Sequence, residues 1–550
     1  MGQTVGGQEI AGRSSTLVGQ VIAGTARWAL IATVIFCAGW LRIDRLDDRH
    51  LWLDEALSWR LATLPFTEIV SRTSEATTVH PPLFFILLRA WMLIGGDSEW
   101  WMRSLACVFG VACVPAAYLA ARNLVTFLWT TGDSSRAASS AGYVAGIVVA
   151  LNPFQVHLAQ QVRGYTLAVF LCLLSTAALA GLLGSAHHRT RWCIFYVMTA
   201  ALACYTHHLA GLTVFAQAIF AICFIYWPPR GVETDPAAVD RRRSLRRTVW
   251  WVGTVLFILV LPLAYPLLRQ SEAAADAWMR PIRGRDIPRE LTEAFVLTSS
   301  SPERVSDLVD LVSLVVLGAL FTGFLFACGW PGRCVALLGS FPVWVLAIYS
   351  LLASRSLFDS RYFAFAQVMW LVGCGVLVAR ISYSVDRWAV AASICLLCAQ
   401  LPLLQRPDDQ RFEHGIRTAV AELRQQVTPG DLVIATTPPV FFEASYYGRH
   451  GPEIGLLSET KSRLQHEAAA HLNDHELLYI DDAMERSPPR IWMLTMPAYD
   501  RAAERSLPSL GSYSLVRKST WRQDWAWERS VELLEYSRIG TENPNVRQSN

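Results

Sequence analysis

Residues 24–60 of the chain read GTARWALIATVIFCAGWLRIDRLDDRHLWLDEALSWR. The stretch begins with an apolar run, Gly24 to Trp40, that is long enough for a retained transmembrane helix and too long for the apolar core of a signal peptide. Shortly after it, two carboxylates, Asp54 and Glu55, stand side by side among aromatic and aliphatic residues. A carboxylate held at a membrane boundary is costly unless it is paired or has a function. The stretch therefore predicts a membrane protein with an acidic site beside its first helix.

The composition of the whole chain agrees with a polytopic membrane protein. Hydrophobic residues make up 53% and charged residues only 17% of the 550 positions, and the mean hydropathy is +0.31, which exceeds what a soluble core could bury. A net charge of +3 is too small to indicate nucleic acid, so no nucleic-acid partner is expected. The 12 cysteines lie in or beside apolar segments, without the spacing of a disulfide framework or a zinc site.

Apolar runs of membrane-spanning length recur through the first three quarters of the chain. A shorter run, Pro81–Gly96, begins with two prolines and carries Arg89, so it is short for a span. We expect about eleven transmembrane helices, near 24–42, 104–125, 141–158, 165–184, 192–206, 209–227, 249–268, 308–329, 334–353, 362–380 and 388–404.

The distribution of arginines favours one topology. If 81–96 does not cross and the amino terminus is cytoplasmic, the basic loops between spans, including Arg241–Arg247, all face the cytoplasm, as the positive-inside rule requires. If 81–96 does cross, the most basic loop faces outward. The first topology is preferred, with 81–96 as an interfacial or re-entrant helix. It predicts a multi-pass protein of the inner, cytoplasmic membrane whose acid pair faces the periplasm.

The domain organisation follows from this topology. The tail after the last span reads as a small α/β domain on the outer side: GDLVIATTPPVFF and RIWMLTM read as buried strands, and FEHGIRTAVAELRQQV as an amphipathic helix. The expected units are a cytoplasmic tail (1–23), a transmembrane catalytic domain (24–404) with an outer loop (43–103), an extracytoplasmic α/β domain (405–540) and a disordered tail (541–550).

The same topology gathers the unusual polar residues on the outer side. Each has a simpler explanation: a carboxylate can be solvated, a single histidine is more often structural, and an arginine at a span end can be snorkelling. Together, however, a carboxylate facing arginines suits transfer of a group from a lipid phosphate, because the carboxylate can remove the acceptor proton while guanidinium groups stabilise the departing phosphate. The candidates are Asp54, Glu55, His80, Arg163, His207, His208 and Arg361.

An ordered series of motifs resembles a known family. The pieces are LWLDEALS, HPPLFFILLRAW, WWMRSLACVFGVACVPAAYLAARNLV, LNPFQVHLAQQVRGYTLAVFLCLL, ACYTHHLAGLTVFAQ and DSRYFAFAQVMWLVGCG. No single piece is specific, but their order over about 350 residues is similar to the GT-C superfamily of membrane glycosyltransferases that use polyprenyl-phosphate sugars. The branch it resembles contains the protein O-mannosyltransferases and lipid A aminoarabinose transferases (glycosyltransferase family 39 and relatives).

The resemblance implies roles for particular residues. Asp54 would be the general base and Glu55 would support it. His80 would lie near the lipid phosphate. The remaining implied contacts to donor phosphate or sugar are Arg163, His207, Arg361 and Tyr362. The implied activity is an inverting hexosyl or pentosyl transfer from a polyprenyl-phosphate sugar to an acceptor whose identity, whether glycan, lipid or protein, stays open.

One departure concerns a metal ion. Many relatives carry an acidic residue in the turn before Arg163, where this chain has Gln160 and Gln161. In relatives that use a divalent ion, this second carboxylate can help to hold it. No cofactor is therefore predicted with certainty, and a Mg²⁺ or Mn²⁺ ion, with Asp54 as its one named ligand, stays open.

Two other functions remain alternatives. A transporter or flippase of lipid-linked substrates would place ionisable residues near the middle of its spans, often beside broken helices, whereas here the predicted spans hold few acids. A non-catalytic relative serving as an assembly partner is compatible with Gln161.

Overall fold

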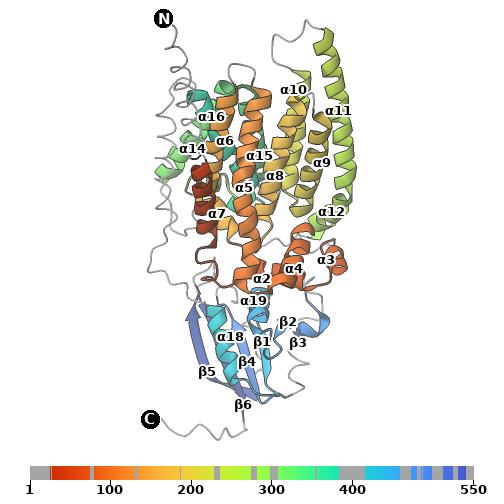
Figure 1. The fold of residues 1–550 in the computed structure, drawn as a ribbon. Coiled ribbons are helices and arrows are strands. Elements are labelled where there is room, and N and C mark those ends of the chain that lie inside the picture. Colours follow the sequence, from red (N-terminus) through yellow and green to blue (C-terminus); the bar gives the residue numbers. More distant parts are fainter. Residues whose placement is uncertain are drawn as a thin grey trace, which may run out of the picture.

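The fold consists of a long bundle of apolar helices with a small α/β domain at one end (Figure 1). This is the membrane protein with a C-terminal α/β domain that the sequence predicted. The computed structural model describes the following residues: 25, 28–74, 80–129, 134–185, 188–227, 236–273, 282–297, 307–353, 356–382, 415–458, 472–479, 485, 487–497, 512–523 and 530–539.

Six helical segments of the described chain are long and apolar enough to cross a membrane. Other apolar helices are shorter or more polar, among them Trp28–Ile43, α9 (Arg189–Thr206) and α10 (Ala210–Tyr226). The predicted span at 388–404 lies outside the described residues. The six are Glu99–Leu128 (α5), Tyr165–Gly184 (α8), Val239–Leu268 (from α11, Pro236–Val260, into α12, Ala264–Ala273), Asp307–Ala327 (α14, Asp307–Thr322, and η5, Gly323–Ala327), Gly329–Leu352 (α15) and Ser360–Ile381 (η6, Ser360–Phe363, and α16, Ala364–Ser382).

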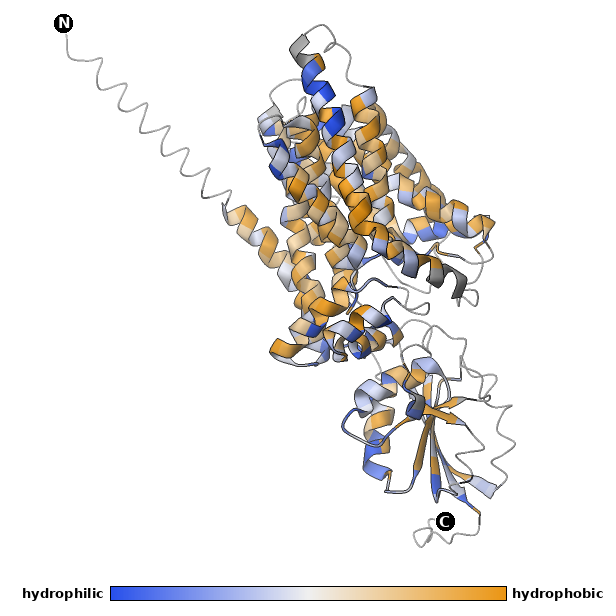
Figure 2. Cartoon of the chain, turned by 90° about the vertical axis from the view of Figure 1, so that its right-hand side faces the viewer, coloured by the Kyte–Doolittle hydropathy of each residue, from blue (hydrophilic) through white to orange (hydrophobic). Residues whose placement is uncertain are grey.

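The helices differ in how deeply they lie in the bundle. In α8, 83% of the most apolar window is buried. The buried share of this window is only 11% in the segment that begins in α11 and 17% in the segment that begins in α14. The latter two thus leave most of their apolar windows exposed, which is the pattern of helices that face lipid. Figure 2 shows that hydrophobic residues predominate along the helices of the bundle. Helices α5, α8 and α16 form the protein-packed centre.

The segment predicted as one span at 141–158 consists of two helices, α6 (Ser134–Leu151) and α7 (Pro153–Ala159), that meet at 60°. Together they are long and apolar enough for one broken span or a re-entrant loop. Pro153 has no amide hydrogen and disfavours helical geometry at Asn152. Asn152 instead caps α7 by accepting a hydrogen bond from the amide of Gln155 (3.1 Å). The carbonyls of Val149 and Ala150, freed by the break, accept hydrogen bonds from buried Arg42 (3.0 and 2.9 Å). The break turns α7 toward the end of the bundle that carries the α/β domain.

Three short helices lie at that end of the bundle, which we call the α2 end (Figure 1). They are α2 (Leu53–Thr63), α3 (Phe66–Arg72) and α4 (Leu83–Gly95). Helix α4 has 13 residues and a length of about 20 Å, short of the ~30 Å hydrocarbon core of a bilayer. Helix α4 is thus short for a span, as expected, and that 81–96 does not cross stays a prediction. Two further short helices, α13 (Ile287–Thr292) and η4 (Glu293–Leu297), lie in the loop before α14.

The C-terminal domain is a six-stranded sheet in the order β3-β2-β1-β4-β6-β5. Strands β1, β2, β3 and β4 pair in parallel, while β6 pairs antiparallel with β4 and β5. Helices α18 and α19 share one hydrophobic core with a single face of the sheet. The bounds are α18 Gly415–Gln426, β1 Leu432–Ala435, α19 Pro438–Gly448, β2 Gly455–Ser458, β3 Leu477–Tyr479, β4 Arg490–Thr495, β5 Tyr513–Arg522 and β6 Ser530–Arg538.

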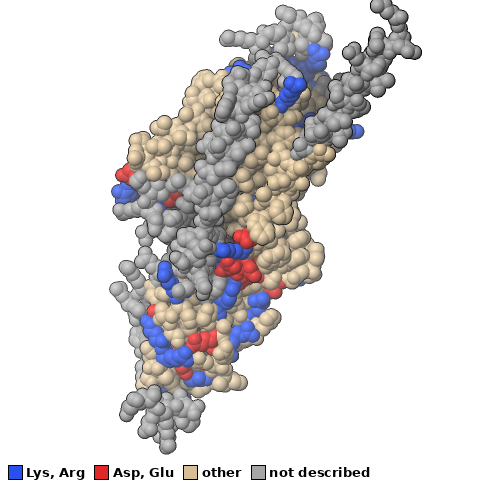
Figure 3. All heavy atoms as spheres, turned by 60° about the vertical axis from the view of Figure 1, so that its left-hand side comes forward, with Lys and Arg blue, Asp and Glu red and all other residues tan. Residues whose placement is uncertain are grey.

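The sequence prediction for this domain needs one correction. RIWMLTM forms β4 and FEHGIRTAVAELRQQV contains α18, as expected, but GDLVIATTPPVFF is not one strand. The strand ends at Ala435, and the two prolines begin α19. Proline is favoured at the first helical positions because its missing amide hydrogen would be unpaired there in any case. In Figure 3 most acidic and basic side chains gather on this domain and at its junction with the bundle.

Candidate active site

Asp54 lies in the first turn of α2 and faces two arginines from distant parts of the chain. Its Oδ2 atom is 3.1 Å from Nη1 of Arg361 and 3.6 Å from Nη2 of Arg163. The Asp54 side chain is 22% exposed, so it is reachable from solvent or substrate. The structure thus brings the predicted carboxylate between the two predicted arginines.

Glu55 points away from these arginines and is buried. Arg103 in α5 holds both of its oxygens, with Nε 2.9 Å from Oε1 and Nη2 2.6 Å from Oε2. The amide of Val162 also donates to Oε1 (2.8 Å). With its acceptors occupied by these groups, Glu55 connects α2, α5 and the turn that precedes Arg163, and we propose that it positions Asp54 rather than taking part in proton transfer.

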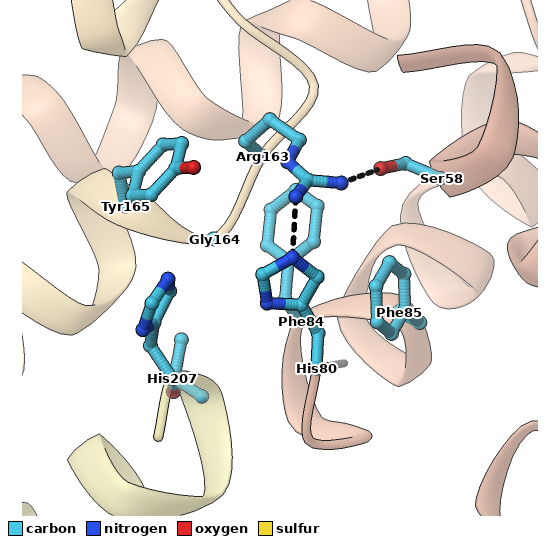
Figure 4. Close-up of a pocket in the computed structure, with 9 residues that line it drawn as sticks. Ser58, His80, Phe84, Phe85, Arg163, Gly164, Tyr165 and His207 are labelled. Atoms are coloured by element: carbon cyan, nitrogen blue, oxygen red, sulfur yellow. Dashed lines mark hydrogen bonds between the residues drawn. The ribbon is translucent and has the colours of Figure 1, made fainter. Parts of the chain in front are cut away.

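Arg163 contacts Asp54 and also lines the pocket drawn in Figure 4. Its Nη1 donates to the main-chain carbonyl of Asp54 (3.2 Å), and its Nη2 donates to Nε2 of His80. A histidine nitrogen that accepts a hydrogen bond carries no proton. Burial, and then the positive charge of Arg163, hold the pKa of His80 well below its usual value. His80 is therefore neutral and orients the guanidinium of Arg163.

A pocket opens beside Arg163 at the α2 end (Figure 4). Its cavity volume is about 10 Å³, roughly the space of a single water molecule and far below the ~300–1,000 Å³ of most small-molecule sites. In this conformation it suits one polar group of a larger ligand. The lining residues are Ser58, His80, Phe84, Phe85, Arg163, Gly164, Tyr165, Thr206 and His207.

Two buried polar atoms of this pocket have no hydrogen-bond partner among the described residues: the hydroxyl of Tyr165 and Nε2 of His207. The Nδ1 atom of His207 accepts the amide hydrogen of Leu209 (3.2 Å), so its Nε2 carries the proton of the neutral ring. Burial, and then the charges of His208 and Arg163, lower the pKa of His207 to about 3. The pocket thus offers neutral donors next to the cationic Arg163, an arrangement that suits an anion.

Sequence reasoning missed Tyr165, Ser58 and Thr206. Tyr165 is the first residue of α8 and stands two positions after Arg163. Its closeness to Arg163 in the motif LNPFQVHLAQQVRGYTLAVFLCLL could have indicated a place in the site. Three of the predicted residues line the pocket: His80, Arg163 and His207. The others are not among its lining residues: Asp54, Glu55, His208, Arg361 and Tyr362. The ring centroid of Tyr362 lies 6.3 Å from that of His207.

Arg361 is fixed by its own segment. Asp359 accepts the amide hydrogen of Arg361 (3.1 Å) and lies 3.3 Å from its Nε. The guanidinium also stands over the rings of Trp52 (5.5 Å) and Tyr362 (5.4 Å), where the faces of the rings attract a cation. These contacts hold the Arg361 guanidinium in place.

The pH dependence of stability tests the neutral state of His207. The unfolded residue titrates near pH 6.5, whereas the folded one has a pKa of about 3. As pH falls from 7 toward 4, protons therefore bind the unfolded chain first, and stability decreases by up to about 1.4 kcal/mol per pH unit for this histidine. We expect His207→Gln to flatten the decline of the melting temperature over this range in lipid nanodiscs. Parallel declines for the two proteins would contradict the assignment.

Gln160 and Gln161, which stand where many relatives carry an acidic residue, make hydrogen bonds to backbone carbonyls and to a histidine. The amide nitrogen of Gln160 lies 3.2 Å from the carbonyl oxygens of Leu41 and Asp44, at the end of the first described helix. The amide nitrogen of Gln161 lies 2.9 Å from Nε2 of His157. Carbonyl oxygens at a helix end require donors, which a carboxylate cannot supply.

This donor set fits a divalent cation poorly. Asp54 is already paired with two guanidinium groups, and in the part of the chain that the structure describes no three His, Cys, Asp or Glu side chains are grouped to hold a metal.

Replacing Gln160 by glutamate tests its role. Gln160→Glu removes a donor and places a negative charge at the negative end of a helix dipole, which should cost about 1–2 kcal/mol. Gln160→Ala removes only the donor and should cost less. Melting temperatures in nanodiscs measure the difference, and a Glu variant as stable as wild type would refute the capping role.

Comparison with known proteins identifies the fold. No protein-family model and no curated protein sequence matches the chain. ArnT from Cupriavidus metallidurans bound to undecaprenyl phosphate superposes with a TM-score of 0.54 at 13% identity, over 93% of this chain and 98% of ArnT. Apo ArnT gives 0.52 at 14% over the same shares. The apo oligosaccharyltransferase of Archaeoglobus fulgidus gives 0.46 at 11%, over 85% and 69%.

The likeness to ArnT extends over nearly the whole of both chains. It shows that this chain shares the fold of ArnT; here a bundle of apolar helices precedes a small α/β domain. The fold predicted from the ordered sequence motifs is therefore confirmed.

Proposed function

We propose that this protein is a glycosyltransferase that moves a hexosyl or pentosyl group from a polyprenyl-phosphate donor to an acceptor glycan, lipid or protein. The observation that carries the proposal is the Asp54 carboxylate between Arg163 and Arg361, beside a pocket whose neutral donors Tyr165 and His207 have no partner among the described residues. A lipid-linked donor fits a site at one end of a membrane bundle because its tail can stay in the bilayer. ArnT, whose fold the chain shares, has been solved with undecaprenyl phosphate bound.

The donor phosphate takes the place between the two arginines. Arg163 and Arg361 both lie against the Asp54 carboxylate. Guanidinium groups bind phosphate strongly, so a phosphate that enters the pocket competes for them and frees the Asp54 oxygen. The hydroxyl of Tyr165 and Nε2–H of His207 complete the set of donors. Substrate binding and release of the base are thereby coupled.

The transfer is a single displacement. Asp54 accepts the proton of the acceptor hydroxyl while that oxygen bonds to the anomeric carbon. The bond from this carbon to the phosphate oxygen breaks, its electron pair leaves with the phosphate, and the arginines stabilise the added charge. A double displacement would need a second group as nucleophile, and Glu55 is committed to Arg103. We therefore infer inversion at the anomeric carbon.

The orientation follows from the charge distribution. The arginine-rich start of α11, which includes Arg241–Arg247, lies at the end of the bundle opposite the α2 end (Figures 1 and 2). By the positive-inside rule, the α2 end and the C-terminal domain then face the periplasm, across the inner membrane from the cytoplasm.

The test uses purified protein in lipid nanodiscs, supplied with the polyprenyl-phosphate sugars extracted from the host membrane. We expect the donor to be consumed, with release of polyprenyl phosphate, when host envelope extract provides the acceptor. A protein that neither transfers nor hydrolyses any of these donors would refute the proposed activity.

A further inference from the structure

Helix α2 is shared between the bundle and the C-terminal domain. Ala56 is fully buried in the hydrophobic core of that domain, and Leu53 and Leu57 pack against the same core. Asp54 is two residues from Ala56, or about 200° around the helix. The helix that carries the carboxylate therefore turns one face toward the site while its opposite face is anchored in another domain.

One hydroxyl group links this domain to the residues that lead into α2. The Oη atom of Tyr447, in α19, accepts the amide hydrogen of Leu51 (2.8 Å) and donates to Oε1 of Glu99, the first residue of α5. The other oxygen of Glu99 is paired with Arg417 from α18, whose guanidinium stands 5.6 Å from the centre of the Tyr447 ring. Burial, and then the charge of Glu99, raise the pKa of Tyr447 well above its usual value, so it keeps its proton as a donor.

The residues next to Leu51 show what this contact controls. Trp52 is extended, and α2 begins without a hydrogen bond from a capping side chain. The Trp52 carbonyl accepts the amide hydrogens of Glu55 and Ala56 (both 2.9 Å), and its ring lies beneath the guanidinium of Arg361. The position of the Leu51–Trp52 backbone therefore sets both the start of α2 and the surroundings of Arg361.

We propose that Tyr447 is a positioning residue for the active site. Through Tyr447, the C-terminal domain fixes the positions of Asp54 and Arg361 relative to each other. The effect of Tyr447 on the transfer rate rests on the proposed glycosyl transfer. Its effect on the order of the Leu51–Trp59 segment is independent of that function.

The adjacent Tyr446 provides a matched control. Its hydroxyl donates to the carbonyl of Asp97 (2.9 Å), its ring packs edge-on against Trp59 (5.1 Å), and Arg449 stands 4.2 Å above it. Tyr446 thus belongs to the same domain junction, but its hydroxyl contacts neither Leu51 nor Glu99. Removing either hydroxyl weakens the junction, whereas only Tyr447→Phe releases the residues that lead into α2.

The experiment compares full-length Tyr447→Phe and Tyr446→Phe in lipid nanodiscs, with the host polyprenyl-phosphate fraction as donor. We expect Tyr447→Phe to lower kcat about tenfold, leave the apparent KM for the donor within about twofold, and raise hydrogen–deuterium exchange in residues 51–59. Tyr446→Phe should keep the wild-type kcat and exchange in this segment.

Equal losses of kcat in the two variants, or unchanged exchange in Tyr447→Phe, would overturn the inference and leave Tyr447 a docking contact. If the wild-type protein transfers no sugar, the proposed function fails, while the exchange measurement still decides whether Tyr447 orders α2.

Discussion

Replacing Asp54 by asparagine should reduce sugar transfer by about 10²–10⁴-fold, the usual contribution of a positioned proton acceptor. Asparagine keeps the size of the side chain and its hydrogen-bonding oxygen but cannot take a proton at neutral pH. Donor binding should persist or improve, because the two arginines lose the carboxylate that competes with phosphate for them. The measurement is the rate of donor consumption in nanodiscs at saturating donor.

The control for Asp54→Asn is Asp359→Asn. Asp359 pairs with the same arginine, Arg361, but its oxygens do not face Arg163 in the contacts that the structure shows. We expect a far smaller rate loss for Asp359→Asn. Equal losses would mean that the charge around Arg361, and not the Asp54 base, sets the rate.

Breaking the buried pair of Glu55 and Arg103 should destabilise the protein by about 3–5 kcal/mol, because a charge is left unpaired in a site that excludes water. The two side chains are 1% and 3% exposed. Glu55→Gln therefore leaves Arg103 without its counter-charge, and Arg103→Met leaves Glu55 without one. Loss of activity should accompany loss of the folded protein, which thermal unfolding in nanodiscs measures.

A double-mutant cycle separates the ion pair from the other contacts of Arg103. The double variant Glu55→Gln with Arg103→Met removes both charges, so it should be more stable than the sum of the single effects predicts. It should not regain wild-type stability, because Arg103 also donates to the carbonyls of Leu46 and Arg49 (both 2.8 Å) and His50 (3.0 Å). Additive single effects would show that the pair is not coupled.

Two features could be predicted from the sequence: that the chain is a membrane protein, and that its unusual polar residues lie together at one end of the bundle. The length of apolar runs fixes which helices can lie in a bilayer, and alternation of those runs puts Asp54, His80, Arg163 and Arg361 at one end. The short α4 was foreseen from its length. The bend between α6 and α7 was not, because Pro153 shows that a helix can break but not which way the next helix turns.

The roles of Glu55 and Tyr447 could not be foreseen, because their partners are distant in the sequence. Glu55 meets Arg103 48 positions later, and Tyr447 meets Leu51 across 396 positions. The hydrophobic periodicity of a sequence predicts helices and strands, but it does not predict which distant residues come into contact. Similarly, the prolines after Ala435 fit either the end of a strand or the start of a helix, and tertiary packing of α19 decided between them. The unpartnered donors of Tyr165 and His207 became visible only once their neighbours were placed.

The central claim, that Asp54 is the base of a transfer from a lipid-linked sugar, is tested most directly in a strain that lacks this gene. The strain is complemented with wild type or Asp54→Asn at equal protein levels, and its lipids and surface glycans are measured by mass spectrometry. We predict that Asp54→Asn leaves a glycan one sugar short while a polyprenyl-phosphate sugar accumulates, and the missing mass names the sugar. Full restoration of lipids and glycans by Asp54→Asn would contradict the claim.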